Sequence, residues 1–128
     1  MSIFEITNIN SKWKMMKKSS LTTEVSYTSK KPAISVLFET ENTKEIRIVM
    51  KADQAMKQHK TPYPITVEIF EGIVNFGVEN DTYQLVKGDV VALEGNIPHD
   101  LKAIENSIIR LSLSKQDSVN RVKEVSKR

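Results

Sequence analysis

The sequence predicts a single all-β domain, either a barrel or a sandwich of short strands. Between residues 21 and 114, β-branched and aromatic residues alternate with polar ones at a period of two, which is the pattern of half-buried strands. Turn signals such as Lys87-Gly88-Asp89 separate these runs at close spacing, and no helix-length segment lies between them. A chain of 128 residues is long enough for one hydrophobic core. The expected strands are residues 21–27, 33–40, 45–51, 65–70, 73–78, 82–86, 89–93, 99–104 and 107–114.

Both ends of the chain have apolar residues at helical spacing. Residues 117–128 begin with Asp117 and Ser118, which can cap a helix, and continue with a narrow stripe of valines and a basic end. We therefore expect a short C-terminal helix over residues 117–128. The spacing near the start permits a short N-terminal helix as well, although neighbouring Asn and Ser side chains compete for its backbone hydrogen bonds. That stripe consists of Ile6, Ile9, Trp13 and Met16.

Composition excludes several classes of function. The chain has no cysteine, so disulfide frameworks, thiolate zinc sites and cysteine nucleophiles are excluded. It shows no signal peptide and no apolar run long enough to span a membrane, so the cytoplasm is the expected compartment. The net charge is only +3, and no stacking aromatic residues interleave the basic ends. A nucleic-acid binder is therefore the last of the functions that we consider.

The chain has two histidines, and alternation predicts that both point into one cavity. His59 has the same parity as the apolar residues of the strand at 65–70, and His99 shares a face with Leu101. A neutral imidazole nitrogen can bind a metal ion or accept a hydrogen bond from a ligand. No residue is identified as catalytic. The predicted ligand pocket consists of His59, Thr61, Tyr63, Ile65, Val67, His99 and Leu101.

At these positions the sequence resembles the cupins, a superfamily of small jelly-roll β-barrels. The first cupin motif has His, His, Glu and Gly, and this chain has His59, Thr61, Ile65 and Gly72 at that spacing. The second motif opens here with Gly88 and closes with Pro98-His99, while Glu94 and Asn96 replace its Pro and Gly. The resemblance covers residues 33–114. It implies one cupin domain over 1–128, with an N-terminal segment of strands at 1–32, the barrel at 33–114 and the terminal helix at 117–128.

The departures from the cupin motif weaken the metal site that the resemblance implies. His59 and His99 are kept, but Thr61 and Ile65 replace a histidine and a carboxylate. The chain is therefore expected to hold no cofactor, or a divalent metal (zinc, nickel or iron, which the sequence does not distinguish) held weakly by His59 and His99. Two functions remain open. One is a small-molecule sensor or binding module, which we favour, and the other is a metal-dependent dioxygenase or isomerase.

The resemblance also implies a homodimer, because small cupins commonly pair. Val49 and Phe70 are apolar residues that alternation places on the outside of the barrel, where they would suit a buried sheet face. The expected partners are thus a small-molecule ligand and a second copy of the chain, with no membrane.

Overall fold

The computed structural model describes residues 15–115, and this part of the chain forms nine β-strands and no helix. The all-β fold class predicted from alternation is confirmed. The two predicted terminal helices, at 117–128 and around residues 6–16, lie outside the described residues or at their very edge. The strands are β1 (Ala33–Glu39), β2 (Thr43–Met50), β3 (Ala55–His59), β4 (Ile65–Glu71), β5 (Ile73–Val78), β6 (Asp81–Val86), β7 (Val90–Leu93), β8 (His99–Ala103) and β9 (Ser107–Ser114).

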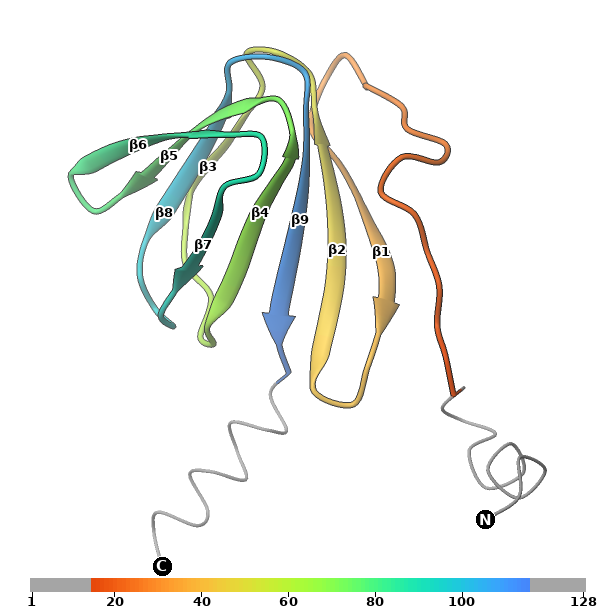
Figure 1. The fold of residues 1–128 in the computed structure, drawn as a ribbon. Helices are drawn as coiled ribbons and strands as arrows, with labels where there is room; N and C mark the ends of the chain where they lie inside the picture. The colour runs from red at the N-terminus through yellow and green to blue at the C-terminus, as the bar shows by residue number, and fades with distance from the viewer. Residues whose placement is uncertain (1–14, 116–128) are drawn as a thin grey trace, which may run out of the picture.

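The strands form two antiparallel sheets that face each other (Figure 1). The larger sheet has the order β1-β2-β9-β4-β7, and the smaller sheet has the order β3-β8-β5-β6. From β2 onwards the chain crosses from one sheet to the other at nearly every connection, so that strands distant in sequence become neighbours. This arrangement is a double-sheet jelly roll.

The core lies between the sheets and consists of the alternate residues that point inwards. On β4, Ile65, Val67 and Ile69 are at most 5% exposed, as the period of two predicted. On β2, Ile48 and Met50 are buried in the same layer. Each fully buried aliphatic side chain contributes about 1.5–3 kcal/mol relative to an exposed one. The two inner faces therefore hold the sheets together mainly through aliphatic packing.

Two differences from the expected strands have a physical cause. Residues 21–27 form no strand, and the carbonyl groups of Thr23 and Glu24 instead accept hydrogen bonds from Arg47 on β2. The structure adds a strand that the sequence did not predict, β3, which pairs with β8. Its residues from Lys57 to His59 are polar and show no clear alternation, so tertiary pairing rather than local propensity produces the strand.

The outer face of the larger sheet is partly closed by the chain itself. The Arg47 guanidinium donates through Nη1 to the carbonyl oxygens of Thr23 at 2.8 Å and Ser20 at 3.3 Å. Val49, on the same face of β2, is only 2% exposed. The prediction that Val49 offers an outward apolar surface for a dimer is therefore wrong, because that side chain is already buried within one copy.

A cluster of charged residues lies further along the same outer face. Glu45 on β2 is 5% exposed, and its carboxylate accepts hydrogen bonds from the Arg110 Nη2 atom at 3.1 Å and the Ser112 hydroxyl at 2.6 Å. Arg110 also reaches Glu68 at 3.4 Å. Cross-strand pairing between β2, β9 and β4 brings these side chains together, and a buried carboxylate is stable only when paired in this way. The cluster links β2, β9 and β4 on the outer face of the larger sheet, so it is not part of the barrel interior.

Candidate functional site

His59 and His99 meet because β3 pairs with β8. His59 ends β3 and His99 begins β8, and the two residues are direct partners in the antiparallel ladder. Their imidazole centroids lie 4.4 Å apart, with an angle of 61° between the ring planes. The two rings therefore contact each other edge to face, and they do so through a strand that the sequence did not predict.

Each imidazole is oriented by a carbonyl group two residues before it. The Nδ1 atom of His59 lies 2.8 Å from the Lys57 carbonyl oxygen, and the Nδ1 atom of His99 lies 2.9 Å from the Ile97 carbonyl oxygen. A carbonyl oxygen only accepts, so both Nδ1 atoms carry the proton. In the neutral rings, both Nε2 atoms then have a lone pair for a ligand.

The two histidines differ in exposure. His99 is only 3% exposed, and its ring stacks on Phe76 with centroids 5.8 Å apart and planes inclined by 15°. His59 is exposed at the end of β3. His99 is therefore a fixed interior group, whereas His59 lies at the border between the interior and solvent.

The two histidines line a small cavity between the sheets. Its volume is about 40 Å³. One water needs about 10–15 Å³ of such space, whereas pockets for drug-sized ligands measure roughly 300–1,000 Å³. The cavity thus has room for a few water molecules or the end of a small ligand. Its lining residues are Ile48, Met56, His59, Thr61, Ile65, Val67, Phe76, His99, Leu101, Ile109, Leu111 and Leu113.

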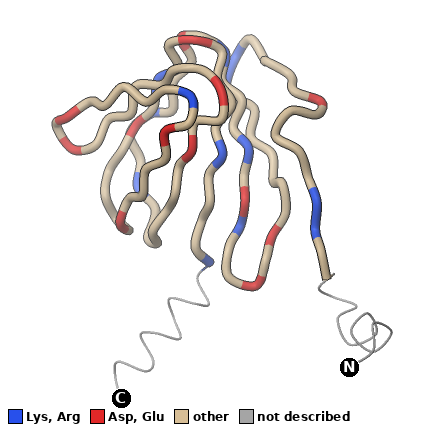
Figure 2. The backbone as a smooth tube through the Cα atoms, viewed as in Figure 1, with Lys and Arg blue, Asp and Glu red and all other residues tan. Residues whose placement is uncertain are grey.

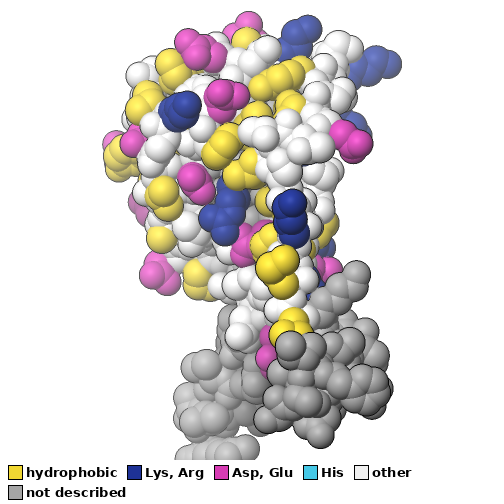
Figure 3. All heavy atoms as spheres, turned by 45° about the vertical axis from the view of Figure 1, so that its right-hand side comes forward, with side chains coloured by type: hydrophobic (Ala, Val, Ile, Leu, Met, Phe, Trp, Pro, Cys, Tyr) yellow, Lys and Arg dark blue, Asp and Glu magenta, His cyan; other side chains and the backbone are white. Residues whose placement is uncertain are grey.

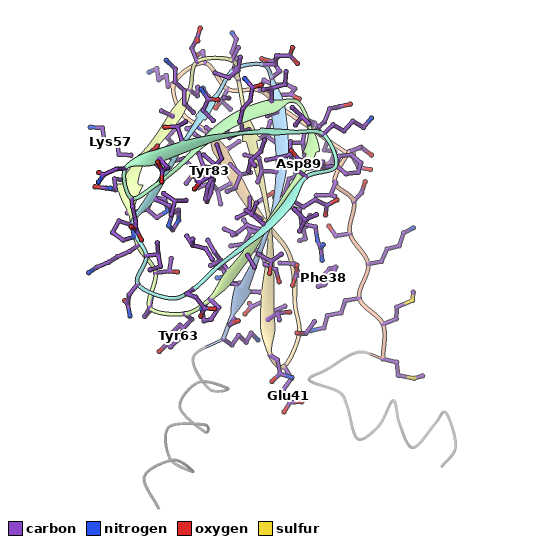
Figure 4. All side chains as sticks on the ribbon, turned by 60° about the vertical axis from the view of Figure 1, so that its left-hand side comes forward. Phe38, Glu41, Lys57, Tyr63, Tyr83 and Asp89 are labelled. Carbon is purple, nitrogen blue, oxygen red and sulfur yellow. The ribbon has the colours of Figure 1, made fainter. Side chains whose placement is uncertain are left out.

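The structure brings together all the predicted pocket residues except Tyr63. That residue lies in the loop before β4, at the lower end of the barrel in Figure 4, and it is not among the lining residues. Its carbonyl oxygen instead accepts a hydrogen bond of 3.0 Å from the Thr61 hydroxyl. Tyr63 therefore orients Thr61 through its backbone, and its parity with Ile65 did not place its ring in the cavity because the loop interrupts the strand.

Sequence reasoning missed several apolar residues of the cavity wall. Ile48, Met56, Ile109 and Leu113 line it from β2, β3 and β9. Alternation on β2 and β9 carried this signal, since Ile48 and Ile109 are direct partners on the inner face. Only the pairing of β9 with both β2 and β4 shows that these residues share a cavity with Ile65 and the histidines.

The cavity lacks two of the four donors that the resemblance implies for a cupin metal site. Ile65 is 5% exposed at the position of the carboxylate, and its aliphatic side chain cannot ligate. Among residues 15–115, no group of three His, Cys, Asp or Glu side chains could hold a metal ion. Catalytic zinc takes three protein ligands, and non-haem iron takes two histidines and a carboxylate. The residues present therefore do not fit a metal held by a full cupin ligand set.

Burial, and secondarily the negative charge of Glu71, raises the pKa of Tyr27 in the N-terminal segment above its ordinary value of 10.0. No helix in the described part of the chain is long and apolar enough to cross a membrane.

Comparison with solved structures identifies the fold. The chain superposes on an RmlC-like cupin from Desulfovibrio desulfuricans with a TM-score of 0.72 and 20% identity, covering 77% of this chain and 96% of the other. This chain has a cupin fold. A conserved protein of unknown function from Streptococcus pyogenes gives a TM-score of 0.68 at 22% identity, over 80% and 90% of the two chains. KdgF from a Halomonas species gives 0.63 at 16% identity, over 77% and 95%.

No protein-family model and no curated protein matches the sequence. In this cupin fold His59 and His99 line the same cavity between the two sheets.

Proposed function

We propose that this cupin is a binding module for a small molecule whose polar end meets the His59–His99 pair. One observation carries the proposal: two imidazoles, each with its Nδ1 atom bound to a carbonyl oxygen, line a cavity whose other lining residues are all apolar except Thr61. Binding sites of this kind combine an apolar wall with a few placed polar groups.

The chemistry of the imidazoles limits the class of ligand. Because both Nδ1–H groups are used by carbonyl oxygens, the Nε2 atoms act as acceptors, and they suit a hydroxyl or amine that donates a hydrogen bond. The volume of about 40 Å³ admits a short apolar chain at most. Any larger part of the ligand extends outwards past the exposed His59.

A pair of isosteric probes tests this proposal. n-Butanol and methyl propyl ether have the same number of heavy atoms, but only the alcohol donates a hydrogen bond. We expect n-butanol to shift the NMR signals of both imidazole Nε2 atoms in a saturable manner, and the ether to shift them much less. Equal effects of the two probes, or no saturable shift with the alcohol, would overturn the proposal.

Two variants supply the control for the same experiment. His99→Phe keeps an aromatic ring against Phe76 and removes the acceptor, so it should abolish the preference for the alcohol. Tyr63→Phe alters a ring that does not line the cavity, and it should leave the preference unchanged.

A metal-dependent enzyme is the second candidate, and one observation favours it. A metal-bound histidine usually donates its other ring N–H to a carbonyl or carboxylate, which is the arrangement of both imidazoles here. A bound divalent metal would act as a Lewis acid. His59 and His99 are the side chains that would hold it, and Thr61 lies at the same cavity.

Elemental analysis separates the two candidates. Protein made without a polyhistidine tag should carry no stoichiometric metal if the chain is a simple binding module. Stoichiometric metal that is lost in both His59→Ala and His99→Ala would favour the enzyme instead.

A further inference from the structure

The Arg47 side chain on β2 has hydrogen-bond donors that the described part of the chain does not use. Its Nη1 atom donates to the carbonyl oxygens of Ser20 and Thr23, and its Nη2 atom has one long contact of 3.4 Å with the Glu24 carbonyl oxygen. Its Nε atom is buried and has no hydrogen-bond partner among residues 15–115. Because buried donors are rarely left unpaired, the edge of the guanidinium that carries Nε and Nη2 is a candidate contact for a ligand.

A pocket of about 490 Å³ lies next to this guanidinium, between the N-terminal segment and the edge of the larger sheet. Its volume is within the roughly 300–1,000 Å³ of small-molecule sites, whereas the cavity at the two histidines measures about 40 Å³. Lys18, Arg47 and several serine and threonine residues line the pocket together with the aliphatic residues Val36 and Leu37. The lining therefore combines positive charge and hydrogen-bond donors with a short apolar wall.

The charged groups of this pocket do not neutralise one another. Lys18 is exposed, and neither it nor Glu24 forms a salt bridge within the described part of the chain. Glu24 is the one acidic residue among the described lining residues, so two cations and one carboxylate leave a charge of +1. Figure 2 shows the basic stretch of the N-terminal segment, and Figure 3 shows Lys and Arg side chains at the surface on this side of the molecule. A ligand with a single negative charge would balance the pocket.

The backbone of Glu24 is strained at the place where Arg47 contacts it. Its φ angle is 56°, in the left-handed region that residues other than glycine, asparagine and aspartate seldom adopt. Strained residues of this kind cluster at binding sites, where the surrounding structure holds them. The Glu24 carbonyl reaches Nη2 only at 3.4 Å, so a ligand oxygen can take its place without breaking either hydrogen bond of Nη1.

We propose that this pocket binds a small organic carboxylate. The carboxylate takes the place of the Glu24 carbonyl oxygen and accepts hydrogen bonds from Nη2 and Nε of Arg47, which is the paired geometry in which a guanidinium binds a carboxylate most strongly. Displacement of that carbonyl uncovers the buried Nε atom and allows Glu24 to leave its strained conformation. Lys18 supplies a second positive charge, and the apolar part of the ligand lies against Val36 and Leu37. The site lies outside the barrel interior, so it does not depend on the ligand proposed for the histidines.

Arg110 provides an internal comparison on the same face of the sheet. Its guanidinium is already paired with the carboxylates of Glu45 at 3.1 Å and Glu68 at 3.4 Å. A carboxylate ligand would have to replace charge-assisted hydrogen bonds at Arg110, whereas at Arg47 it replaces one long contact with a neutral carbonyl. Arg47 should therefore respond to a carboxylate, and Arg110 should not.

Benzoate and benzamide are matched probes for the main test, because they have the same number of heavy atoms and only benzoate is charged. Titration of the full chain is followed through the NMR signals of the arginine Nε–H groups, which Arg47→Lys assigns. We expect benzoate to shift the Arg47 signal in a saturable manner and to leave the Arg110 signal unchanged, with benzamide at least about tenfold weaker. No saturable shift, equal shifts at both arginines, or equal binding of benzamide would overturn the proposal.

Inorganic phosphate tests the class of anion. It carries nearly two negative charges at neutral pH and has no apolar part, so it matches neither the charge of +1 nor the aliphatic wall. We expect phosphate to compete with benzoate only at concentrations at least about tenfold above those of benzoate itself. Phosphate binding as tight as that of benzoate would assign the pocket to phosphate groups, and the carboxylate proposal would be wrong.

Two lysine variants test the contribution of Lys18. Lys18→Gln removes one positive charge from the pocket and should raise the dissociation constant of benzoate about threefold at low salt. Lys87→Gln removes a charge from the exposed turn between β6 and β7, and it should leave the dissociation constant unchanged. Both side chains are exposed, so both variants should fold, which circular dichroism checks. No effect of Lys18→Gln, or an equal effect of the two variants, would contradict the proposed contact.

Substitutions at Ser35 test whether the pocket recognises charge at Arg47. Ser35 is exposed, lines the pocket and is the direct ladder partner of Arg47, so the two side chains share a face of the sheet. Ser35→Glu places a carboxylate opposite the guanidinium and should weaken benzoate binding at least about tenfold more than Ser35→Gln, which has the same size and no charge. Equal losses in the two variants would mean that bulk alone excludes benzoate, and the proposal would be wrong.

Discussion

His59 and His99 are direct partners in the β3–β8 ladder, and their rings lie 4.4 Å apart in an edge-to-face contact. The protein backbone fixes the position of both rings. Strand pairing brings the two residues together, and a backbone carbonyl oxygen two residues earlier binds the Nδ1 atom of each ring. The pair therefore exists before any ligand arrives, and a ligand does not have to order two flexible side chains to use it.

The two histidines should contribute unequally to stability. His99 is 3% exposed and stacked on Phe76, so His99→Ala leaves a hole in the core and should lower the free energy of unfolding by about 1–3 kcal/mol. His59 is exposed, and His59→Ala should change it by less than about 0.5 kcal/mol. Urea denaturation of both variants measures the difference, and equal losses would contradict the assignment of His99 as the interior member of the pair.

The absent metal ligands can be restored, and the effect should be specific to the cavity. In a Thr61→His, Ile65→Glu double variant the cavity gains an imidazole and a carboxylate, which gives four donors with His59 and His99. Without metal, the buried carboxylate should destabilise the fold. With Zn²⁺ or Ni²⁺ at 100 times the dissociation constant, the variant should regain about 2.7 kcal/mol.

A matched control separates this effect from charge alone. Thr66 neighbours Ile65 but is exposed on the outer face, so Thr66→Glu should show neither the loss of stability nor the response to metal. Thermal unfolding with metal and with chelator measures both variants. If metal stabilises the unchanged chain as strongly as the double variant, then Ile65 does not explain the weak site.

Particular residues show how far the sequence could predict this structure. The alternation on β4 placed Ile65, Val67 and Ile69 inside, and the structure confirms it. The convergence of His59 and His99 was predicted from parity with β4, but it arises from β3, which has no local signal because its end is polar. A strand that exists only through its partner cannot be predicted from its own residues.

The size of the cavity was beyond sequence reasoning for a different reason. Its volume of about 40 Å³ depends on how closely side chains from several strands pack, and no single segment contains that information. The burial of Val49 on the outer face was likewise not predictable from the sequence. Alternation predicts correctly that its side chain points outwards, but it does not show that this side chain is buried there.

Two glycines with positive φ should respond differently to the same substitution. Gly72 joins β4 to β5 with φ of +99°, and a Cβ atom there would lie 2.6 Å from the Asn106 carbonyl oxygen. Gly88 has φ of +94°, but a Cβ atom there would meet no atom within 4 Å. Gly88→Ala should therefore cost only the conformational penalty of about 1–2 kcal/mol.

Gly72→Ala adds a steric overlap with the backbone to that penalty. We expect a total loss of more than about 3 kcal/mol, which places it among the severe single substitutions. Chemical denaturation of the two variants gives the comparison. A loss at Gly72 no greater than that at Gly88 would show that the close approach between this turn and the start of β9 can relax at little cost.

The raised pKa of Tyr27 makes stability fall at alkaline pH. Burial is the larger cause and the carboxylate of Glu71 the smaller one, and both disfavour the phenolate in the folded state. The unfolded chain therefore loses this proton first, at its ordinary pKa of 10.0, so the stabilisation is complete below pH 10 and is lost as pH rises through the higher folded value. Tyr27→Phe should flatten this part of the stability profile, and Glu71→Gln should lower the folded pKa, as tyrosinate absorbance during titration measures. Because Tyr27 belongs to the segment that covers the larger sheet, an unchanged profile in Tyr27→Phe would mean that this segment does not hold the phenol against the sheet in solution.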